Sequence, residues 1–118
     1  MAKQKISIVR GTTEYYAVSV IGSEGEPYEL QTGEILRFGV KSRTDAPTYI
    51  IKKELTSEDA DEDGEYPIKL EPSDTQNLPF GTYYYDIGLQ SGDDYFSVIE
   101  ASEFIVAKNI TSWEAVNT

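Results

Sequence analysis

The sequence contains neither cysteine nor histidine, and these two absences remove most of the common catalytic and metal-binding chemistry. Without cysteine there is no disulfide and no thiolate nucleophile, and a cytosolic site of synthesis is favoured. Without histidine there is no Ser-His-Asp triad and no usual ligand for zinc or iron. An enzyme built from this chain would depend on carboxylates, tyrosines and lysines alone. We therefore expect a protein that is not an enzyme and that uses no cofactor.

Positive charge and long apolar runs are also scarce. Ten basic residues oppose 21 acidic ones, which leaves a formal net charge of −11. Such a surface repels phosphate backbones and anionic lipids, so we expect neither nucleic acid nor a membrane as partner. The apolar run Ile6 to Val9, behind Lys3 and Lys5, is too short for a signal peptide, and no run approaches the length of a membrane span. The sequence predicts a soluble domain without an export signal.

The strongest strand signal lies in the segment 78–89, where a Pro/Gly corner precedes a run of alternating residues. One face of this run carries Tyr83, Tyr85, Ile87 and Leu89. The opposite register would bury Asp86 without a basic partner, and a buried unpaired carboxylate is very costly. The alternation therefore predicts which face of the strand is buried.

Six further segments are predicted to be strands. They are residues 6–9, 15–21, 34–42, 49–53, 66–70 and 95–106. Pro67 predicts an edge strand, because proline cannot donate a hydrogen bond to a ladder. We therefore expect segment 49–53 to pair with 34–42 and not with 66–70. We also expect a break at Ala101–Ser102, since Glu100 would otherwise share a face with apolar residues.

Short strands separated by turns, each with one apolar face, are typical of an all-β sandwich. In immunoglobulin-like domains a tyrosine near the start of strand F bonds to backbone upstream, two residues before a core cysteine. Tyr83 fits the tyrosine and Tyr85 fits the place of the cysteine. We predict an immunoglobulin-like sandwich of about seven antiparallel strands in the strand order of a fibronectin type III domain. Strands one, two and five would face strands four, three, six and seven.

The predicted sandwich spans residues 1–110, and residues 111–118 form a C-terminal tail. Within the tail, Thr111 to Glu114 has the spacing of a capping box, which indicates a short helix. The sequon at Asn109 is interpreted as accidental, because no secretion signal accompanies it.

One acidic segment invites a metal interpretation. Residues 59–64 match the first half of an EF-hand calcium loop, but the twelfth position, which needs a bidentate glutamate, is Leu70. The flanks also alternate like strands and not like helices. We favour a solvated acidic loop, and no metal ligand is assigned.

Three aromatic residues are candidates for an interface: Tyr15, Tyr84 and Trp113. Tyr15 and Tyr84 lie off the buried parity of their strands, although exposed tyrosines are common in sheets. Trp113 either folds back over the end of the sandwich or anchors a neighbouring subunit, because tryptophan and tyrosine are frequent in binding hot spots.

Several segments together resemble a known family. They are Ile6 to Gly11, Leu36 to Lys41, Ile68 to Thr75, Leu78 to Ile87 and Phe104 to Thr111. They are similar to the small immunoglobulin-like domains of phages and prophages of Gram-positive bacteria, in particular the N-terminal domain of baseplate upper proteins. The resemblance covers roughly residues 4 to 111, and its most specific part is L-P-x-G-x-Y-x-Y-D-I after P-x-D-T.

The resemblance implies a non-enzymatic virion structural protein of the tail or baseplate, made in the bacterial cytoplasm. It implies other phage structural proteins as partners and assembly as a homo-oligomer. It provides no site residue, since the shared motif is structural. A carbohydrate-binding β-sandwich module, with exposed aromatic rings as platforms, is the alternative function.

Overall fold

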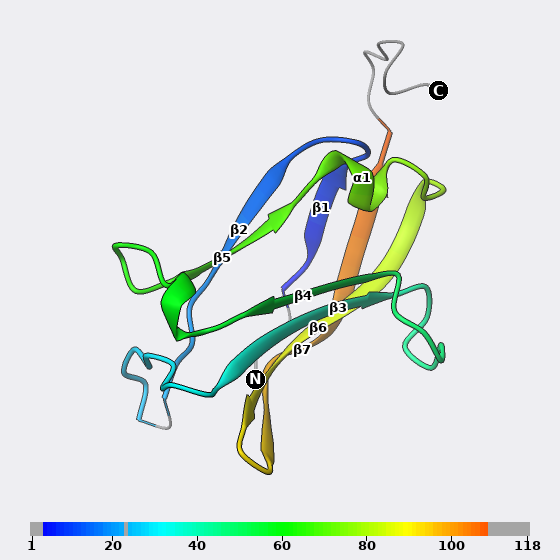
Figure 1. Ribbon diagram of the computed structural model, residues 1–118. Coiled ribbons are helices and arrows are strands. Elements are labelled where there is room, and N and C mark those ends of the chain that lie inside the picture. Colours follow the sequence, from blue (N-terminus) through cyan, green and yellow to red (C-terminus); the bar gives the residue numbers. More distant parts are fainter. Residues whose placement is uncertain (1–3, 23, 109–118) are drawn as a thin grey trace.

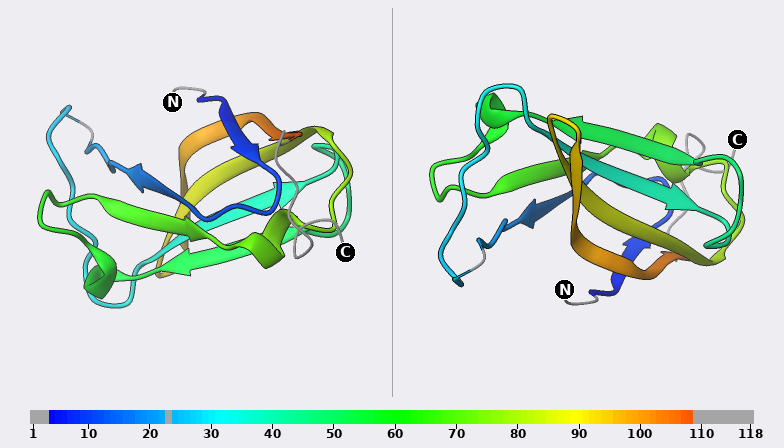
Figure 2. Two further views of the ribbon diagram at one scale, coloured as in Figure 1. Left: turned by 90° about the horizontal axis from the view of Figure 1, so that it is seen from above. Right: turned by 90° about the horizontal axis from the view of Figure 1, so that it is seen from below.

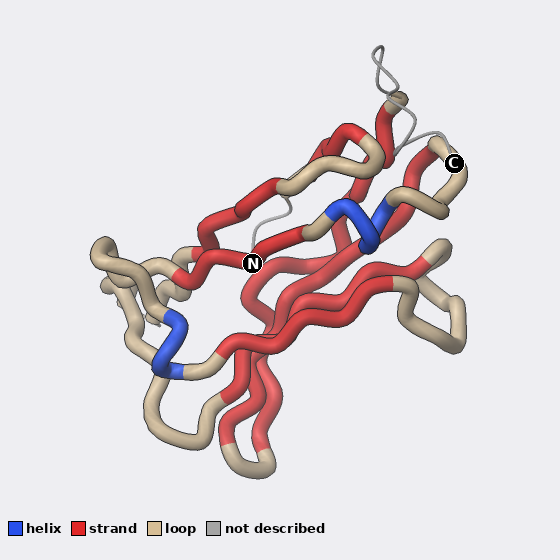
Figure 3. Tube along the Cα trace, turned by 45° about the horizontal axis from the view of Figure 1, so that its top comes forward, coloured by secondary structure: helices blue, strands red, loops and turns tan. Residues whose placement is uncertain are grey.

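The structure, a computed structural model, describes residues 4–22 and 24–108 and contains seven strands in two sheets (Figure 1). The strands are β1 (Ile6–Val9), β2 (Glu14–Val18), β3 (Ile35–Lys41), β4 (Ile51–Leu55), β5 (Tyr66–Leu70), β6 (Gly81–Ser91) and β7 (Asp94–Ala107). Two helical turns, η1 (Ser57–Asp59) and α1 (Pro72–Thr75), lie in the connections between strands (Figure 3). The prediction of an all-β fold is confirmed.

The larger sheet has the order β1-β7-β6-β3-β4, and the smaller sheet pairs β2 with β5. Strand β4 pairs with β3, as predicted, in a register that places Val40 opposite Ile51. Pro67 lies in β5, at the edge of the two-stranded sheet, which confirms the edge assignment. The sheet is mixed, because β1 runs parallel to β7 while the other neighbours are antiparallel.

The predicted place of the first strand is wrong. It does not join β2 and β5; it pairs with β7, with Ile6 opposite Phe104, and so belongs to the larger sheet (Figure 2). Ile6 and Ile8 still face the core, as the alternation predicts. A four-residue alternating segment can bury the same side chains from either sheet, because alternation selects a face and not a neighbour.

The core between the two sheets centres on three aromatic rings. The ring centroid of Phe38 lies 5.5 Å from that of Tyr85 and 6.3 Å from that of Phe104, and those of Tyr85 and Phe104 are also 6.3 Å apart. These separations are in the range favoured for tilted and edge-to-face ring pairs. The predicted inward residues of β6 are all buried and Asp86 is exposed, which confirms the predicted parity.

The predicted break at Ala101–Ser102 is wrong, because β7 is continuous from Asp94 to Ala107. The strand is bulged nearby instead. Between the pairs Tyr85–Ser102 and Ile87–Ile99, β6 advances two residues while β7 advances three. A second extra residue lies between Ile99 and Ser97. The bulges shift the alternation, so Glu100 is exposed while Ser102 is buried, and the ladder continues.

The bounds of β2 and β4 differ from those of the predicted segments 15–21 and 49–53. Strand β2 ends at Val18 and not at Ile21, because the chain turns back through Gly22 and Ile21 forms only an isolated bridge to Pro27. Strand β4 begins at Ile51, so Tyr49 precedes it. The predicted tail 111–118, its helix and the sequon lie outside the described residues.

The predicted corner tyrosine is confirmed by a hydrogen bond. The hydroxyl of Tyr83 donates to the carbonyl oxygen of Pro79 over 2.6 Å, four residues upstream. The hydroxyl of Tyr85 donates to the carbonyl of Gln4 and so ties β6 to the start of β1. The two tyrosines fix the entry of β6 and the position of the first strand.

Replacing Tyr83 with phenylalanine should lower the free energy of unfolding by about 0.5–1.5 kcal/mol, because the carbonyl of Pro79 loses its donor while the ring packing remains. Urea unfolding of Tyr83→Phe measures this. The control is Tyr84→Phe, one residue along on the outward face, which should change stability by less than about 0.5 kcal/mol. Equal effects of the two substitutions would contradict the assigned role of the corner bond.

Alkaline stability should depend on Tyr85. Burial, with a smaller contribution from Tyr16, raises the pKa of Tyr85 to about 12, whereas the unfolded chain ionises near the usual value of 10.0. The contribution of Tyr85 to the free energy of unfolding is therefore fully present below pH 10 and is lost as pH rises toward 12. In this range the Tyr85 hydroxyl releases its proton in the unfolded chain but keeps it in the folded protein. Between these pH values the wild type should lose about 2–3 kcal/mol more than Tyr85→Phe. Urea unfolding at several pH values measures both, and parallel pH profiles would contradict this account.

Candidate functional site: a tyrosine-rich sheet face

The side of the larger sheet that faces away from the core is polar and aromatic. In the centre of this face the outward residues of β3 and β6 are Arg37, Gly39, Lys41, Tyr84, Asp86 and Gly88. Two further tyrosines lie over the glycines, Tyr49 from the segment before β4 and Tyr95 from β7. We call these eight residues the tyrosine face.

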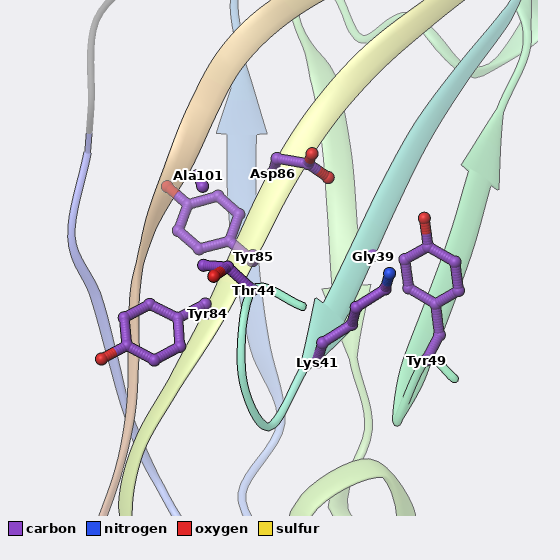
Figure 4. A pocket seen from close by; sticks show the side chains of 8 residues that line it. All are labelled: Gly39, Lys41, Thr44, Tyr49, Tyr84, Tyr85, Asp86 and Ala101. Carbon is purple, nitrogen blue, oxygen red and sulfur yellow. The ribbon is translucent and has the colours of Figure 1, made fainter. Parts of the chain in front are cut away.

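Tyr49 lies on Gly39. A methyl group at Gly39 would collide with the Tyr49 ring, so the ring lies directly against the glycine backbone. The Nζ of Lys41 is 4.6 Å from the centroid of this ring, and that of Lys52 is 5.8 Å from it. Figure 4 shows the Lys41 ammonium turned toward Tyr49. These cation–π contacts hold a half-exposed ring in a defined position.

Tyr95 lies on Gly88 in the same way. A methyl group at Gly88 would collide with the hydroxyl end of the Tyr95 side chain. Glycine is unfavourable within strands because it has no side chain to pack, and a ring that crosses its backbone covers the exposed hydrogen bonds. Gly39 and Gly88, on the adjacent strands β3 and β6, thus each support one tyrosine side chain, and we call these two residues the glycine floors.

The charged groups of the tyrosine face influence one another's pKa. Loss of hydration raises the pKa of Asp86, and the positive charge of Lys41 opposes this rise. Loss of hydration, followed by Asp86 and Tyr49, raises the pKa of Tyr95, and Arg37 opposes this. Arg37 Nε also lies 3.3 Å from a carboxylate oxygen of Glu54 on β4. The face therefore carries charges of both signs between its rings.

The surface between Tyr49 and Tyr84 is slightly hollowed. A cleft of about 70 Å³ is lined by Gly39, Lys41, Thr44, Tyr49, Tyr84, Tyr85, Asp86 and Ala101 (Figure 4). This volume is far below that of pockets that enclose a small-molecule substrate, about 300–1,000 Å³. The arrangement is therefore suited to contact with another surface and not to enclosing a reactant.

The structure separates the three residues predicted as interface candidates. Tyr84 lies on the tyrosine face, half-buried, where it pairs across the strands with Lys41 and Glu103. Tyr15 lies on β2, in the other sheet, and its side chain is 63% exposed. Trp113 lies outside the described residues. Tyr15 and Tyr84 belong to the outward faces of opposite sheets, so they do not form one site.

Sequence reasoning missed Tyr49 and Tyr95, although they are 49% and 56% exposed. The sequence pattern predicts Tyr49 within a strand and Tyr95 as the first residue of one. The available signal was the pair of outward glycines, because glycine inside a strand often marks the close approach of another group. The sequence does not reveal which side chains make that approach.

The acidic loop brings three carboxylates together but does not form an EF-hand. Oxygens of Asp61, Asp63 and Glu65 lie within 4.8 Å of one another. One oxygen of Asp61 accepts hydrogen bonds from the backbone N–H groups of Asp63 and Glu65, both over 2.9 Å. Leu70, at the twelfth loop position, is buried in β5. The geometry is that of a turn stabilised by an aspartate.

Comparison of the chain with protein-family models, with curated proteins and with solved structures found no match. Neither helical turn in the described part of the chain has the length or hydropathy needed to cross a bilayer.

The contact between Gly39 and Tyr49 predicts a coupling energy. In the wild type Gly39→Ala displaces the ring, whereas in a Tyr49→Ser background the same change should stabilise the protein by about 0.5 kcal/mol, because alanine suits a strand better than glycine. We expect a coupling energy of about 1 kcal/mol in a double-mutant cycle measured by urea unfolding. Tyr15→Ser, on the other sheet, is the control background and should give additive effects. Additivity in both cycles would contradict the ring placement.

Proposed function

We propose that this protein is a non-enzymatic structural component of a phage or prophage virion, in the tail or baseplate, that acts through protein–protein contacts. The observation that carries the proposal is the tyrosine face, an exposed aromatic and charged surface on a rigid sheet. The resemblance of segment 78–87 and its neighbours to phage immunoglobulin-like domains supplies the biological setting.

An immunoglobulin-like sandwich is the finer fold that we propose. It is supported by the layers, since β2 and β5 face β3, β6 and β7 as strands B and E face C, F and G in that fold. It is also supported by the corner bond of Tyr83 and by Tyr85, which is buried at the place of the second core cysteine. The parallel placement of β1 on β7 departs from the order predicted from sequence.

The composition of the tyrosine face favours a protein partner. Tyrosine and arginine are enriched in interfaces and in their hot spots. Tyr49 and Tyr95 are already positioned by the glycine floors, so binding would cost less conformational entropy than it would for free side chains. Arg37, Lys41 and Asp86 add charges of both signs, which provide specificity for a complementary surface. Other virion proteins or further copies of this chain are the partners that we propose.

A carbohydrate-binding function is the second candidate. The observation that favours it is that two tyrosine side chains on one face, those of Tyr49 and Tyr95, are about half exposed. Flat aromatic groups of this kind can pack on the apolar faces of sugar rings.

Incorporation into particles tests the proposed function. Particles purified after induction of the prophages in the encoding strain should contain the chain, detected by mass spectrometry. A Tyr49→Ser/Tyr95→Ser double variant should be incorporated at least about tenfold less, as expected for the loss of two interface anchors. Tyr15→Ser is the matched control and should be incorporated normally, and thermal unfolding verifies that each variant is folded.

Two outcomes would contradict the proposal. One is absence of the wild-type chain from particles, and the other is equal incorporation of the double variant. Glycan-array binding that the double variant loses and Tyr15→Ser keeps would favour the carbohydrate alternative instead.

A further inference from the structure

A second surface lies on the core side of the larger sheet, away from the tyrosine face. It is a groove of about 1080 Å³ between β2 and the segment after it on one side and the β6–β7 hairpin on the other. Its lining includes Val18 and Ile21 on the first wall and Phe96 and Val98 on the second, with Ile87 between them. In Figure 1 the tip of the hairpin extends well beyond the two-stranded sheet.

The groove exists because β1 covers only one end of β7. Strand β1 pairs with Phe104 to Ala107, and the hydrogen bond from Gln4 N to Ser102 Oγ, over 3.0 Å, lies just beyond this pairing toward the groove. Among the described residues, no strand pairs with the outer edge of β7 between Asp94 and Ile99, or with the edge of β2 that faces away from β5. Two open strand edges thus border an apolar groove.

The edge of β2 lacks the usual protection against strand pairing. Exposed edges are commonly blocked by lysine or proline, and here β4 carries Lys52 and Lys53 and β5 carries Pro67. Residues 14–18 of β2 contain neither lysine nor proline. This edge therefore carries neither of the two residue types that most often block strand pairing.

The groove is apolar at its mouth and acidic in charge. Ile21 and Phe96 are each 54% exposed, a large fraction for residues of this kind on opposite walls. The lining contains Glu26, Glu34 and Asp94 but neither lysine nor arginine. Glu34 is buried, and its carboxylate accepts hydrogen bonds from Tyr28 and from the backbone of Gln31. Burial alone would raise the pKa of Glu34, but these hydrogen bonds and one from Ser91 outweigh it and lower the pKa, so the group is charged at neutral pH.

We infer that this groove binds an extended strand of another polypeptide in which apolar and basic residues alternate. The strand pairs with the open edge of β2 or β7, its apolar side chains enter between Ile21 and Phe96, and its basic side chains meet the carboxylates. This mode is β-augmentation, in which main-chain hydrogen bonds provide affinity and alternate side chains provide specificity. The inference goes beyond the proposed function, because it concerns the opposite side of the sheet and a different partner.

Charge complementarity decides between the possible occupants. A second copy of this chain carries a net charge of −11, so two copies repel each other around an acidic groove. Nucleic acid is repelled for the same reason. A basic strand is attracted by the carboxylates of the lining and by the charge of the whole molecule.

The probe for the test is an eight-residue peptide of alternating lysine and valine. It is compared with a peptide of the same composition in block order and with one of alternating glutamate and valine. Calorimetry should show the lysine–valine peptide binding at least about tenfold more tightly than either, since charge pairs with the exposed Glu26 and Asp94 and a correct alternation each add to the affinity. Hydrogen exchange should show new protection of amides in β2 or in residues 95–99.

Variants separate binding in the groove from general attraction to an acidic protein. Ile21→Lys and Phe96→Lys should each weaken binding about tenfold or more by placing a charge in the groove. Ile50→Lys introduces the same charge at an exposed apolar residue outside the groove and should leave the affinity within about twofold, as expected for a distant surface charge. All three residues are exposed, so the variants should fold, and thermal unfolding verifies this.

Four outcomes would overturn the inference. They are failure of the lysine–valine peptide to bind, equal binding of the block or glutamate peptide, equal weakening by Ile50→Lys, and protection confined to the tyrosine face. A dimer of the chain alone in light scattering that Ile21→Lys dissociates would also overturn it, because the occupant would then be a second copy. Virion incorporation is measured separately, so failure of either proposal leaves the other intact.

Discussion

The burial of Tyr85 against Phe38 and Phe104 is the constraint on which the rest of the structure depends. It sets which side of β6 faces the core, and alternation then sends every second residue to the other side. Asp86 is therefore exposed, and Gly88 becomes a floor on the outward face. The tyrosine face is thus the reverse side of the same packing decision, and a one-residue shift of register would remove both.

The hydroxyl of Tyr85 also donates a hydrogen bond to the carbonyl of Gln4, just before β1, and β1 pairs with β7 in the larger sheet. With β1 beside β7, the smaller sheet has only two strands and cannot cover the hairpin end of the larger one. Within the described part of the chain, no third strand of the smaller sheet covers the inward residues at this end of β6 and β7, and the groove lies there.

The two proposed surfaces, the tyrosine face and the groove, differ in the charged residues that they carry. Of the ten basic residues of the chain, the tyrosine face contains two, Arg37 and Lys41, and the lining of the groove contains none. In a molecule with a net charge of −11, the tyrosine face carries Arg37 and Lys41 against Asp86, a local net charge of +1, whereas the lining of the groove carries only acidic charges and suits a basic partner. Both surfaces lie on one sheet, so partners bound to them would be held in a fixed relative orientation.

Seven strand segments, the buried face of β6, the pairing of β4 with β3 and the corner bond of Tyr83 could be predicted from the sequence, because alternation, proline and tyrosine act locally. The bounds of β2 and β4 and the bulges of β7 could not, because they depend on the neighbouring strand and on the turn that follows. Tertiary structure alone decided where β1 pairs, since Ile6 and Ile8 could be buried from either sheet. It also decided that Tyr49 and Tyr95 cross Gly39 and Gly88, a contact between segments that no local pattern encodes. Alternation predicts which side chains are buried, but the residues that they contact come from distant segments and are known only from the tertiary structure.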